Sequence, residues 1–307
     1  MINSLSKNTI SQYNVALKQW FQFCQLHNTD LYDVTVAFIL NFFTHIFQKG
    51  ASYGTLNSFR SALSLILSKK LSNDENISRF FKGVFRIKPT FPKYNAIWNP
   101  NLVLEYLSKL YPNESLNLNM LTKKLVTLLA LSTGQRVQTL SLINVQEVNI
   151  TDSQITIPIN EVIKTSRPNR HNPNLIIPFF KQKESICPAM TLCTYISKTS
   201  ELRNAPNTNK LILTFKKPMH AASPQTISRW IKQTLGKSGV DVSTFSAHST
   251  RHAATSAANR SGVAIDVIKK TAGWTGNSIC FAKFYNQPLI NTECDSSFAE
   301  AIINDQT

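Results

Sequence analysis

The first third of the chain shows the periodicity of amphipathic helices. Between residues 7 and 88 apolar side chains recur every three to four positions, with further apolar runs at 35–47, 53–67 and 77–85. This spacing lines one face of a helix, so it predicts four short helices that form a small bundle. The apolar face of the first helix comprises Tyr13, Leu17, Trp20, Phe21 and Cys24. We interpret Phe42, Phe43 and Phe47 in the second run as core side chains rather than as a binding surface.

Residues 88–97 break the helical pattern. Pro89 and Pro92 stand among basic residues there, and such a stretch between two periodic regions is typical of an interdomain linker. At 307 residues the chain also exceeds the usual size of a single domain. We therefore expect a helical N-terminal domain at 1–90 and a second domain at 91–307.

The second region mixes helices with short strands. Helical patterns cover 101–110 and 121–132, the latter ending at Gly134, and later ones cover 190–198, 226–235, 251–259 and 265–271. Apolar segments at 155–159 and 175–178 predict two strands, joined by a polar stretch that holds Lys164 near a turn. A β-hairpin and a three-stranded sheet both satisfy this pattern. The predicted fold class is mainly α with a small β-sheet, a helical domain followed by a mixed α/β domain.

The charge of the chain indicates a polyanionic partner. Lys plus Arg number 33 against 17 Asp plus Glu, which gives a net charge of +16 and a pI near 9.7. The basic residues are scattered in ones and twos rather than gathered in a tail, which favours a folded basic surface over a disordered arm. Nucleic acid is the first candidate partner, and a membrane surface is less favoured.

Cysteine usage and hydropathy bear on the compartment. The five cysteines, at 24, 187, 193, 280 and 294, are odd in number and widely spaced, so neither a disulfide framework nor a zinc site is indicated. No apolar run approaches the roughly 20 residues of a membrane span, and the first residues lack the shape of a signal peptide. The sequence therefore predicts an intracellular protein, nuclear if its source is eukaryotic.

A set of polar and aromatic residues carries the candidate chemistry. His248 and Arg251 stand three residues apart and so share one helical face, and the planar fork of an arginine matches phosphate oxygens. Trp274 and Tyr285 follow within one short segment, and Arg136 lies far upstream. Each residue alone is more typical of an ordinary surface or core position. Together they indicate a phosphate-handling site.

The order of these residues resembles the signature of the tyrosine recombinase, or phage integrase, family, which is Arg, a hairpin Lys, His-x-x-Arg, His or Trp, then Tyr. The matching residues here are Arg136, Lys164, His248, Arg251, Trp274 and Tyr285. The sequence Thr-Gly-Gln-Arg ending at Arg136 resembles the family's Thr-Gly-x-Arg box, and Ala-Gly-Trp precedes Tyr285 as the family leads one to expect. These boxes, and the segment around Trp98, look closest to recombinases of eukaryotic DIRS-type and Crypton-type mobile elements.

The resemblance implies a role for each residue. Arg136 and Arg251 would stabilise the charge that grows on the phosphate oxygens, and Tyr285 would attack to form a covalent 3′-phosphotyrosine. His248 is the candidate base for the phenol, and Lys164 the candidate acid for the departing 5′ oxygen. For Trp274 a phosphate contact through the indole N–H and ordinary core packing both stay open.

Further residues receive supporting roles, and two positions depart from the family pattern. His252 is a candidate for a contact behind the catalytic residues, and Arg167 and Arg170 are candidates for DNA contacts. No metal, ATP or other cofactor is expected. Thr139 stands where an acidic residue commonly follows the first arginine, so something else must orient Arg136. Trp274 and Tyr285 are 11 positions apart, more than is common in bacterial members, which implies a longer loop before the tyrosine.

The resemblance implies site-specific DNA recombination by a tetramer on two DNA sites, serving a mobile genetic element. The helical domain would clamp one side of the duplex, and an amphipathic patch at 298–303 would dock on a neighbouring protomer or else pack on its own domain. Two rival functions are a type IB topoisomerase-like enzyme that nicks and reseals DNA and a domesticated DNA-binding protein without catalysis. The presence of all six signature residues argues against the second rival.

Overall fold

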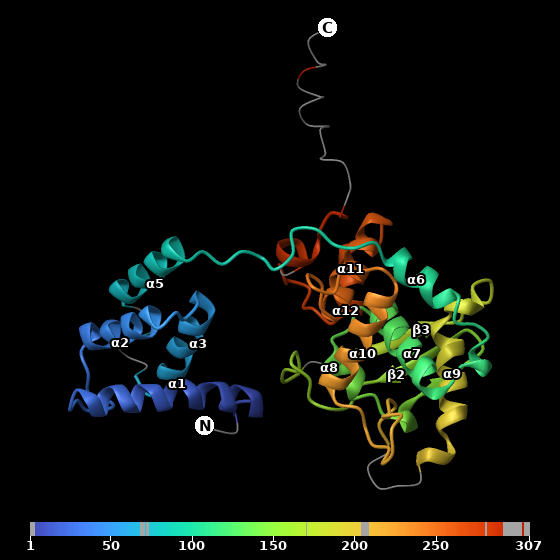
Figure 1. The fold of residues 1–307 in the computed structure, drawn as a ribbon, viewed down its shortest axis with the longest axis horizontal. Coiled ribbons are helices and arrows are strands. Elements are labelled where there is room, and N and C mark those ends of the chain that lie inside the picture. Colours follow the sequence, from blue (N-terminus) through green and yellow to red (C-terminus); the bar gives the residue numbers. More distant parts are fainter. Residues whose placement is uncertain are drawn as a thin grey trace. The chain divides into compact units, whose positions relative to one another are not determined.

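The computed structural model describes residues 4–67, 71, 74–169, 171–203, 209–279, 281–290 and 303. The chain divides into two compact units, Met1–Lys93 and Tyr94–Thr307 (Figure 1). Of the residues named above, Arg170, Cys280 and Cys294 lie outside the described ones, as does the expected patch at 298–303 apart from Ile303. No helix among the described residues has both the length and the apolarity needed to cross a bilayer.

In the described residues of the first unit, a small bundle is formed by α1 (Lys7–Leu26), α2 (Val36–Gln48), α3 (Tyr53–Leu63) and α5 (Glu75–Ile87) (Figure 1). Each helix begins behind a residue whose side-chain oxygen accepts a backbone N–H of the first turn. These N-caps are Ser6, Thr35, Ser52 and Asp74. The predicted four-helix organisation is confirmed, although α3 ends four residues before the expected position.

Aromatic rings form the centre of this bundle. The Trp20 ring on α1 meets the Phe42 ring on α2 edge to face at 5.1 Å, and Phe43 meets Phe81 on α5 at 5.5 Å. Phe42 and Phe43 are fully buried, which confirms that they are core side chains. Phe21 is 45% exposed, contrary to its place on the expected apolar face. One helical position is a rotation of about 100°, so the residue next to buried Trp20 leaves the core.

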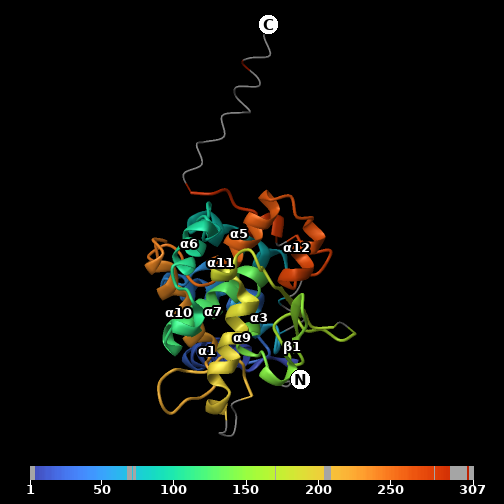
Figure 2. The ribbon, with the colours of Figure 1, turned by 90° about the vertical axis from the view of Figure 1, so that its right-hand side faces the viewer.

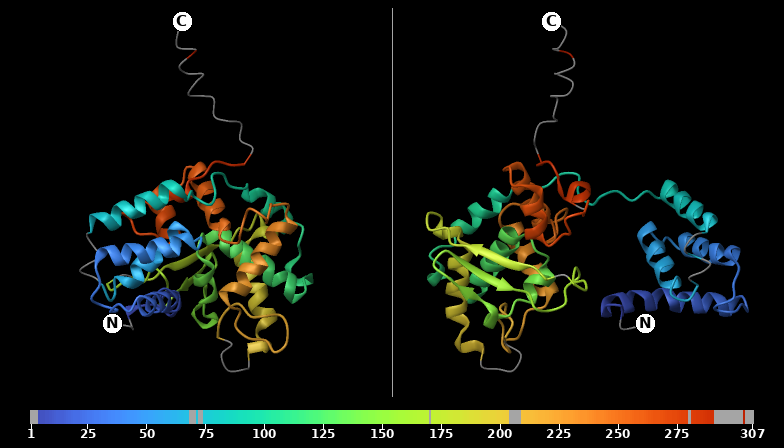
Figure 3. Two further views of the ribbon diagram at one scale, coloured as in Figure 1. Left: turned by 60° about the vertical axis from the view of Figure 1, so that its left-hand side comes forward. Right: turned by 180° about the vertical axis from the view of Figure 1, so that it is seen from behind.

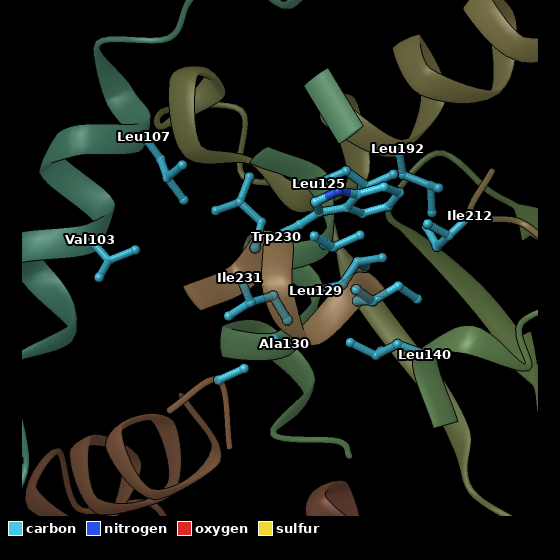
Figure 4. Packing of buried hydrophobic residues seen from close by; sticks show 14 of the residues in the cluster. Val103, Leu107, Leu125, Leu129, Ala130, Leu140, Leu192, Ile212, Trp230 and Ile231 are labelled. Carbon is cyan, nitrogen blue, oxygen red and sulfur yellow. The ribbon is translucent and has the colours of Figure 1, made fainter. Parts of the chain in front are cut away.

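The second unit is built around the buried helix α7 (Leu118–Thr133), which contacts α9 (Pro188–Thr199), α10 (Pro224–Lys237) and α11 (Ser249–Arg260) (Figure 2). Leu125 and Leu129 of α7 pack there with Trp230 and Ile231 of α10 and with Leu192 of α9 (Figure 4). Further helices among the described residues are α6 (Pro100–Ser108), α8 (Val137–Ser141) and α12 (Ile265–Ala272), and short 3₁₀ turns lie at Asn113–Ser115, Val145–Glu147, Glu184–Ile186 and Glu201–Arg203.

A three-stranded antiparallel sheet lies in the same unit, in the order β1 (Asn149–Ile150), β2 (Gln154–Pro158) and β3 (Asn174–Pro178) (Figure 3). Ile155 pairs with Ile177 and Ile157 with Leu175, and these four side chains are buried. They alternate along each strand with more exposed residues, as expected for a sheet covered on one face. Of the two arrangements that the sequence allowed, the three-stranded sheet is the one that forms.

Lys124 is a buried cation in the middle of α7. Its side chain is fully buried, and its Nζ donates to the Leu110 carbonyl at 2.6 Å and to Asn113 Oδ1 at 2.8 Å. Burial disfavours the ammonium form and lowers the pKa of Lys124 from 10.5 to about 8, against a smaller opposing effect of Glu114. The lysine thus ties the loop before α7 to the helix through hydrogen bonds of its side chain.

This pKa sets the sign of a stability change at alkaline pH. Between about pH 8 and 10.5 the unfolded chain binds more protons at Lys124 than the folded chain, so the free energy of unfolding should rise with pH in that window. We expect Lys124→Met to reduce this slope by about 1 kcal/mol per pH unit. Urea unfolding at pH 8, 9 and 10 measures it, with exposed Lys183→Met as the control. Equal slopes in wild type and Lys124→Met would contradict the assignment.

Candidate active site

Arg251 is the buried centre of the site. It lies in the first turn of α11 with 1% of its surface exposed, and its Nη1 donates to the Gly134 carbonyl at 2.6 Å and to the Ala272 carbonyl at 2.5 Å. Both carbonyls are at helix C-termini, where the helix dipole is negative and favours a cation. Gly134 caps α7 with φ +58° and Gly273 caps α12 with φ +74°, a left-handed conformation that favours glycine. The glycines of the two boxes therefore end helices α7 and α12 where the Gly134 carbonyl and the Ala272 carbonyl, just before Gly273, accept from Arg251.

Arg136 follows Gly134 by two residues and is the N-cap of α8. The turn between them is fixed by buried Gln135, whose Nε2 donates to the Thr271 carbonyl at 2.6 Å. A Cβ on Gly273 would lie 3.4 Å from the same Gln135 nitrogen, so the α12 terminus packs directly on this turn. The Arg136 side chain is half-buried and makes no hydrogen bond among the described residues. The backbone turn thus fixes the position from which the Arg136 side chain projects, without an acidic residue at position 139.

His248 and Tyr285 meet within hydrogen-bond distance, with His248 Nε2 3.0 Å from Tyr285 Oη. His248 is exposed at the start of α11, whereas Tyr285 is half-buried and ends a π-helical turn, Phe281–Tyr285. Single π turns occur often at functional sites. Ser256 Oγ donates to the Tyr285 carbonyl and accepts from Gln287 N at 3.1 Å. The backbone at Tyr285 and just after it is therefore held by α11.

Two rings pack against the Tyr285 ring, and one of them also contacts the Arg251 guanidinium. The His252 ring stacks on the Tyr285 ring with centroids 4.0 Å apart and an interplanar angle of 17°, and the Trp274 ring meets it edge to face at 4.7 Å. Arg251 Cζ lies 3.9 Å from the Trp274 ring centroid, a cation–π distance. The indole is buried and carries the arginine on its face, and a contact of its N–H with a phosphate stays a prediction.

Burial also determines the charge of His252. Its removal from water is the largest effect, and together with the nearby His248 it lowers the pKa of His252 from 6.5 to about 4, although a backbone hydrogen bond with Phe284 acts in the opposite direction. The ring is therefore neutral near pH 7. A neutral imidazole can stack on the phenol without placing a second buried charge beside Arg251.

Lys164 lies apart from these groups, on the connection between β2 and β3. Ser166 N donates to the Ile163 carbonyl at 3.0 Å, and Ser166 Oγ donates to Asn172 Oδ1 at 2.6 Å, which fixes a tight turn with Lys164 at its corner. The lysine is exposed and contacts no other candidate site residue in the described part of the chain. Its neighbour Thr165 and Trp274 nevertheless line one cavity of about 1020 Å³, so the turn and the aromatic cluster border a common space.

The sequence did not indicate all the residues that hold the site. Arg167 is exposed beside the turn and Arg170 lies outside the described residues. Ser256 and Tyr94, which contacts the His252 ring at 5.2 Å, were missed. A signal existed for Ser256, since residues 248, 252 and 256 follow one another at helical i, i+4 spacing. No group of three or more His, Cys, Asp or Glu side chains suited to a metal occurs among the described residues.

Comparisons with known proteins give the family. Residues 104–290 match the model of the phage integrase family, whereas no curated protein matches closely enough to count as a relative. The fold is similar to that of a XerH site-specific recombinase bound to palindromic difH substrate in a post-cleavage complex (14% identity, 96% of this chain and 78% of that chain covered, TM-score 0.64).

Two further solved structures share the fold. They are the Tn1549 transposon integrase in complex with transposon right end DNA (13% identity, 98% of this chain and 94% of that chain, TM-score 0.61) and a lambda integrase dimer bound to a COC′ core site (16% identity, 95% and 92%, TM-score 0.57). The family match spans more than half of the chain and contains Arg136, Lys164, His248, Arg251, Trp274 and Tyr285. The chain therefore belongs to the phage integrase family of tyrosine recombinases, enzymes that break and rejoin DNA strands.

Proposed function

We propose that the chain is a site-specific DNA recombinase that acts through a covalent 3′-phosphotyrosine at Tyr285. The observation that carries the proposal is the 3.0 Å approach of His248 Nε2 to Tyr285 Oη, next to a buried arginine whose Cζ is 5.5 Å from the Tyr285 ring centroid. A phenol has a pKa of about 10, so a base within hydrogen-bond reach makes it a competent nucleophile near neutral pH.

In the proposed reaction Tyr285 Oη attacks the phosphorus, and a bond forms between them as the bond from phosphorus to the 5′ oxygen breaks. His248 takes the phenol proton, and Lys164 gives a proton to the 5′ oxygen, which leaves as a hydroxyl. Arg136 and Arg251 stabilise the negative charge on the non-bridging oxygens. Attack by a second 5′ hydroxyl on the phosphotyrosine reverses these steps and rejoins the strand. Because the phosphotyrosine retains the energy of the phosphodiester bond, the cycle needs no ATP. Because the two arginines stabilise the charge, it also needs no metal ion.

The direct test is to trap the adduct. A duplex with a nick close to the cleavage site loses the short 5′ hydroxyl fragment by diffusion, so the phosphotyrosine should accumulate as a protein–DNA species that survives denaturation. We expect it to form in EDTA. A strict requirement for added magnesium, or product strands without any covalent intermediate, would contradict the proposed function.

A separate prediction concerns Lys164, whose exposure on a tight turn supports a side chain that reaches bound DNA. Lys164→Ala should cleave ordinary DNA slowly, because the 5′ oxygen must otherwise leave as an alkoxide, a strong base and therefore a poor leaving group. A substrate with sulfur at that bridging position leaves as a thiolate with a pKa of about 8.5. Single-turnover cleavage of both substrates should show the sulfur substrate restoring the rate.

Arg167→Ala, three residues away and also exposed, is the matched control for Lys164→Ala. Its cleavage rate relative to wild type should be similar on the ordinary and the sulfur substrate. Arg136→Ala should not be rescued either, because the charge that it stabilises is unchanged by the sulfur. Rescue of Arg167→Ala but not of Lys164→Ala would show that another hairpin residue is the acid.

We also propose that the helical unit contacts DNA. On α5 the side chains of Arg79, Lys82 and Arg86 are exposed, and Lys82 and Arg86 line a cavity of about 390 Å³ with Phe85 and Tyr53. Basic side chains beside aromatic ones suit a phosphate backbone. This arrangement supports a clamp of two domains around the duplex.

Recombination and topoisomerase activity differ in the number of protomers that act together. We propose a tetramer; one lambda integrase structure with a similar fold is a tetramer bound to a Holliday junction (14% identity, TM-score 0.55). Removing residues 291–307 should then reduce synapsis of two DNA sites more than cleavage of one. Efficient relaxation of supercoiled plasmid by a protein that stays monomeric on DNA would favour the topoisomerase alternative. A role in a eukaryotic mobile element of the DIRS or Crypton type, with nuclear action, belongs to the same proposal.

A further inference from the structure

A column of rings connects the start of the second unit to the candidate nucleophile. The Tyr94 ring stacks on Phe245 at 5.2 Å and 29° and meets the His252 ring edge to face at 5.2 Å and 82°. His252 in turn stacks on Tyr285 at 4.0 Å. The His252 ring is therefore enclosed between two tyrosines, one from the start of the unit and one from its C-terminal part.

Polar contacts fix the Tyr94 end of this column and the start of α11. Tyr94 Oη lies 3.0 Å from Ser246 Oγ and accepts from Ser246 N at 3.3 Å, so it holds the turn that enters α11. Trp98 Nε1 donates to Ser249 Oγ at 2.8 Å in the first turn of the same helix. These contacts position the backbone from which His248 and His252 project.

The same segment holds the chain beyond Tyr285. Ile97 N donates to the Pro288 carbonyl at 2.8 Å, and Ile290 N donates to the Ile97 carbonyl at 2.9 Å. Residues 94–98 thus contact α11 through side chains and the stretch after Tyr285 through backbone hydrogen bonds. His252 completes the connection between these two elements, because its ring contacts Tyr94 on one side and stacks on the phenol on the other.

We propose that His252 is a positioning residue, whose ring keeps the Tyr285 phenol beside His248 and is itself held in place by Tyr94. The proposal rests on the function proposed above and adds to it the group that fixes the direction of attack. His252 Nδ1 is buried without a hydrogen-bond partner, whereas the ring also makes a backbone hydrogen bond with Phe284, next to Tyr285. We assign the positioning to the stacking of the ring on the phenol, and the substitutions below separate stacking from that hydrogen bond.

Three substitutions separate stacking from hydrogen bonding. His252→Phe keeps an aromatic ring, His252→Gln keeps a polar donor without a ring, and His252→Ala removes both. In single-turnover formation of the covalent adduct on the nicked duplex, we expect His252→Phe to stay within about threefold of wild type. The other two should be slower by roughly 10- to 100-fold, the range expected when a reacting group is misplaced by about 1 Å.

Controls distinguish positioning from loss of structure or of DNA binding. The DNA affinity of all three variants should stay close to wild type, and melting curves should show all three folded at the temperature of the assay. A bridging-sulfur substrate should not restore His252→Ala, because attack rather than departure of the 5′ oxygen is impaired. Equal rates for wild type and His252→Ala, or a fast His252→Gln beside a slow His252→Phe, would overturn the proposal.

Tyr94→Ala tests the second contact. It should slow adduct formation, and the double variant Tyr94→Ala/His252→Ala should be no slower than the slower single variant, since both act through one ring. If the rate losses of the two single variants multiply in the double variant, the role given to Tyr94 is wrong. A wild-type protein that forms no adduct contradicts the proposed function, whereas an active wild type with an equally active His252→Ala contradicts only the positioning role.

Discussion

Tyr285→Phe is expected to abolish the covalent protein–DNA adduct, with a loss on the order of 10⁴-fold or more in single-turnover cleavage, because the attacking oxygen is removed. The ring should still stack on His252 and meet Trp274, so DNA affinity and stability should change little. The change also removes the contact of the phenol with His248. Gel assays of adduct formation and of DNA binding on the same nicked duplex measure both quantities.

Tyr106→Phe is a suitable control for this change. Tyr106 is likewise half-buried and lies in α6 of the same unit, but it makes no contact with His248, His252 or Arg251. Adduct formation should stay at the wild-type level in Tyr106→Phe. A covalent adduct formed by Tyr285→Phe would mean that the nucleophile has been misidentified.

Arg251→Ala is expected to damage both folding and catalysis. Its Nη1 bonds with the Gly134 and Ala272 carbonyls would be lost, and the loss of a buried, charged donor costs about 2–5 kcal/mol in the free energy of unfolding. Adduct formation should fall by roughly 10³-fold or more, measured well below the lowered melting temperature. Urea unfolding and single-turnover cleavage report the two effects separately.

Arg136→Ala should separate these two effects. Its side chain is half-buried and makes no hydrogen bond among the described residues, so the free energy of unfolding should change by less than about 1 kcal/mol. Cleavage should nevertheless fall strongly, as in Arg251→Ala. Unchanged stability in Arg251→Ala, or full activity in Arg136→Ala, would contradict the roles given to the two arginines.

Periodicity was sufficient for most helices because it depends on local geometry. The apolar spacing around Trp20 corresponds to the buried face of α1. The break in the helical pattern at Gly134 corresponds to the end of α7. Phe21 was placed wrongly because a face drawn from spacing alone is wider than the buried stripe of α1. The two-residue strand β1 is too short to produce a recognisable alternation of its own.

Tertiary contacts explain what the sequence could not show. Arg136 and Arg251 are 115 positions apart, and only the resemblance paired them; in the structure the Gly134 carbonyl joins their elements. The carbonyl partners of Arg251 are backbone groups, which leave no trace in a residue pattern. Tyr94 stands in what the sequence indicates as a linker, and its contact with His252 bridges 158 positions, so no local signal marked it.

The most direct test of the account is to identify the atom that becomes joined to DNA. The adduct would be formed on a nicked duplex in EDTA, digested with protease and nuclease, and its nucleotide-bearing peptide sequenced by mass spectrometry. The account predicts a single modified residue, Tyr285, linked through its phenol oxygen to a 3′ phosphate. Modification of another residue, or a link to the 5′ end of the strand, would contradict it.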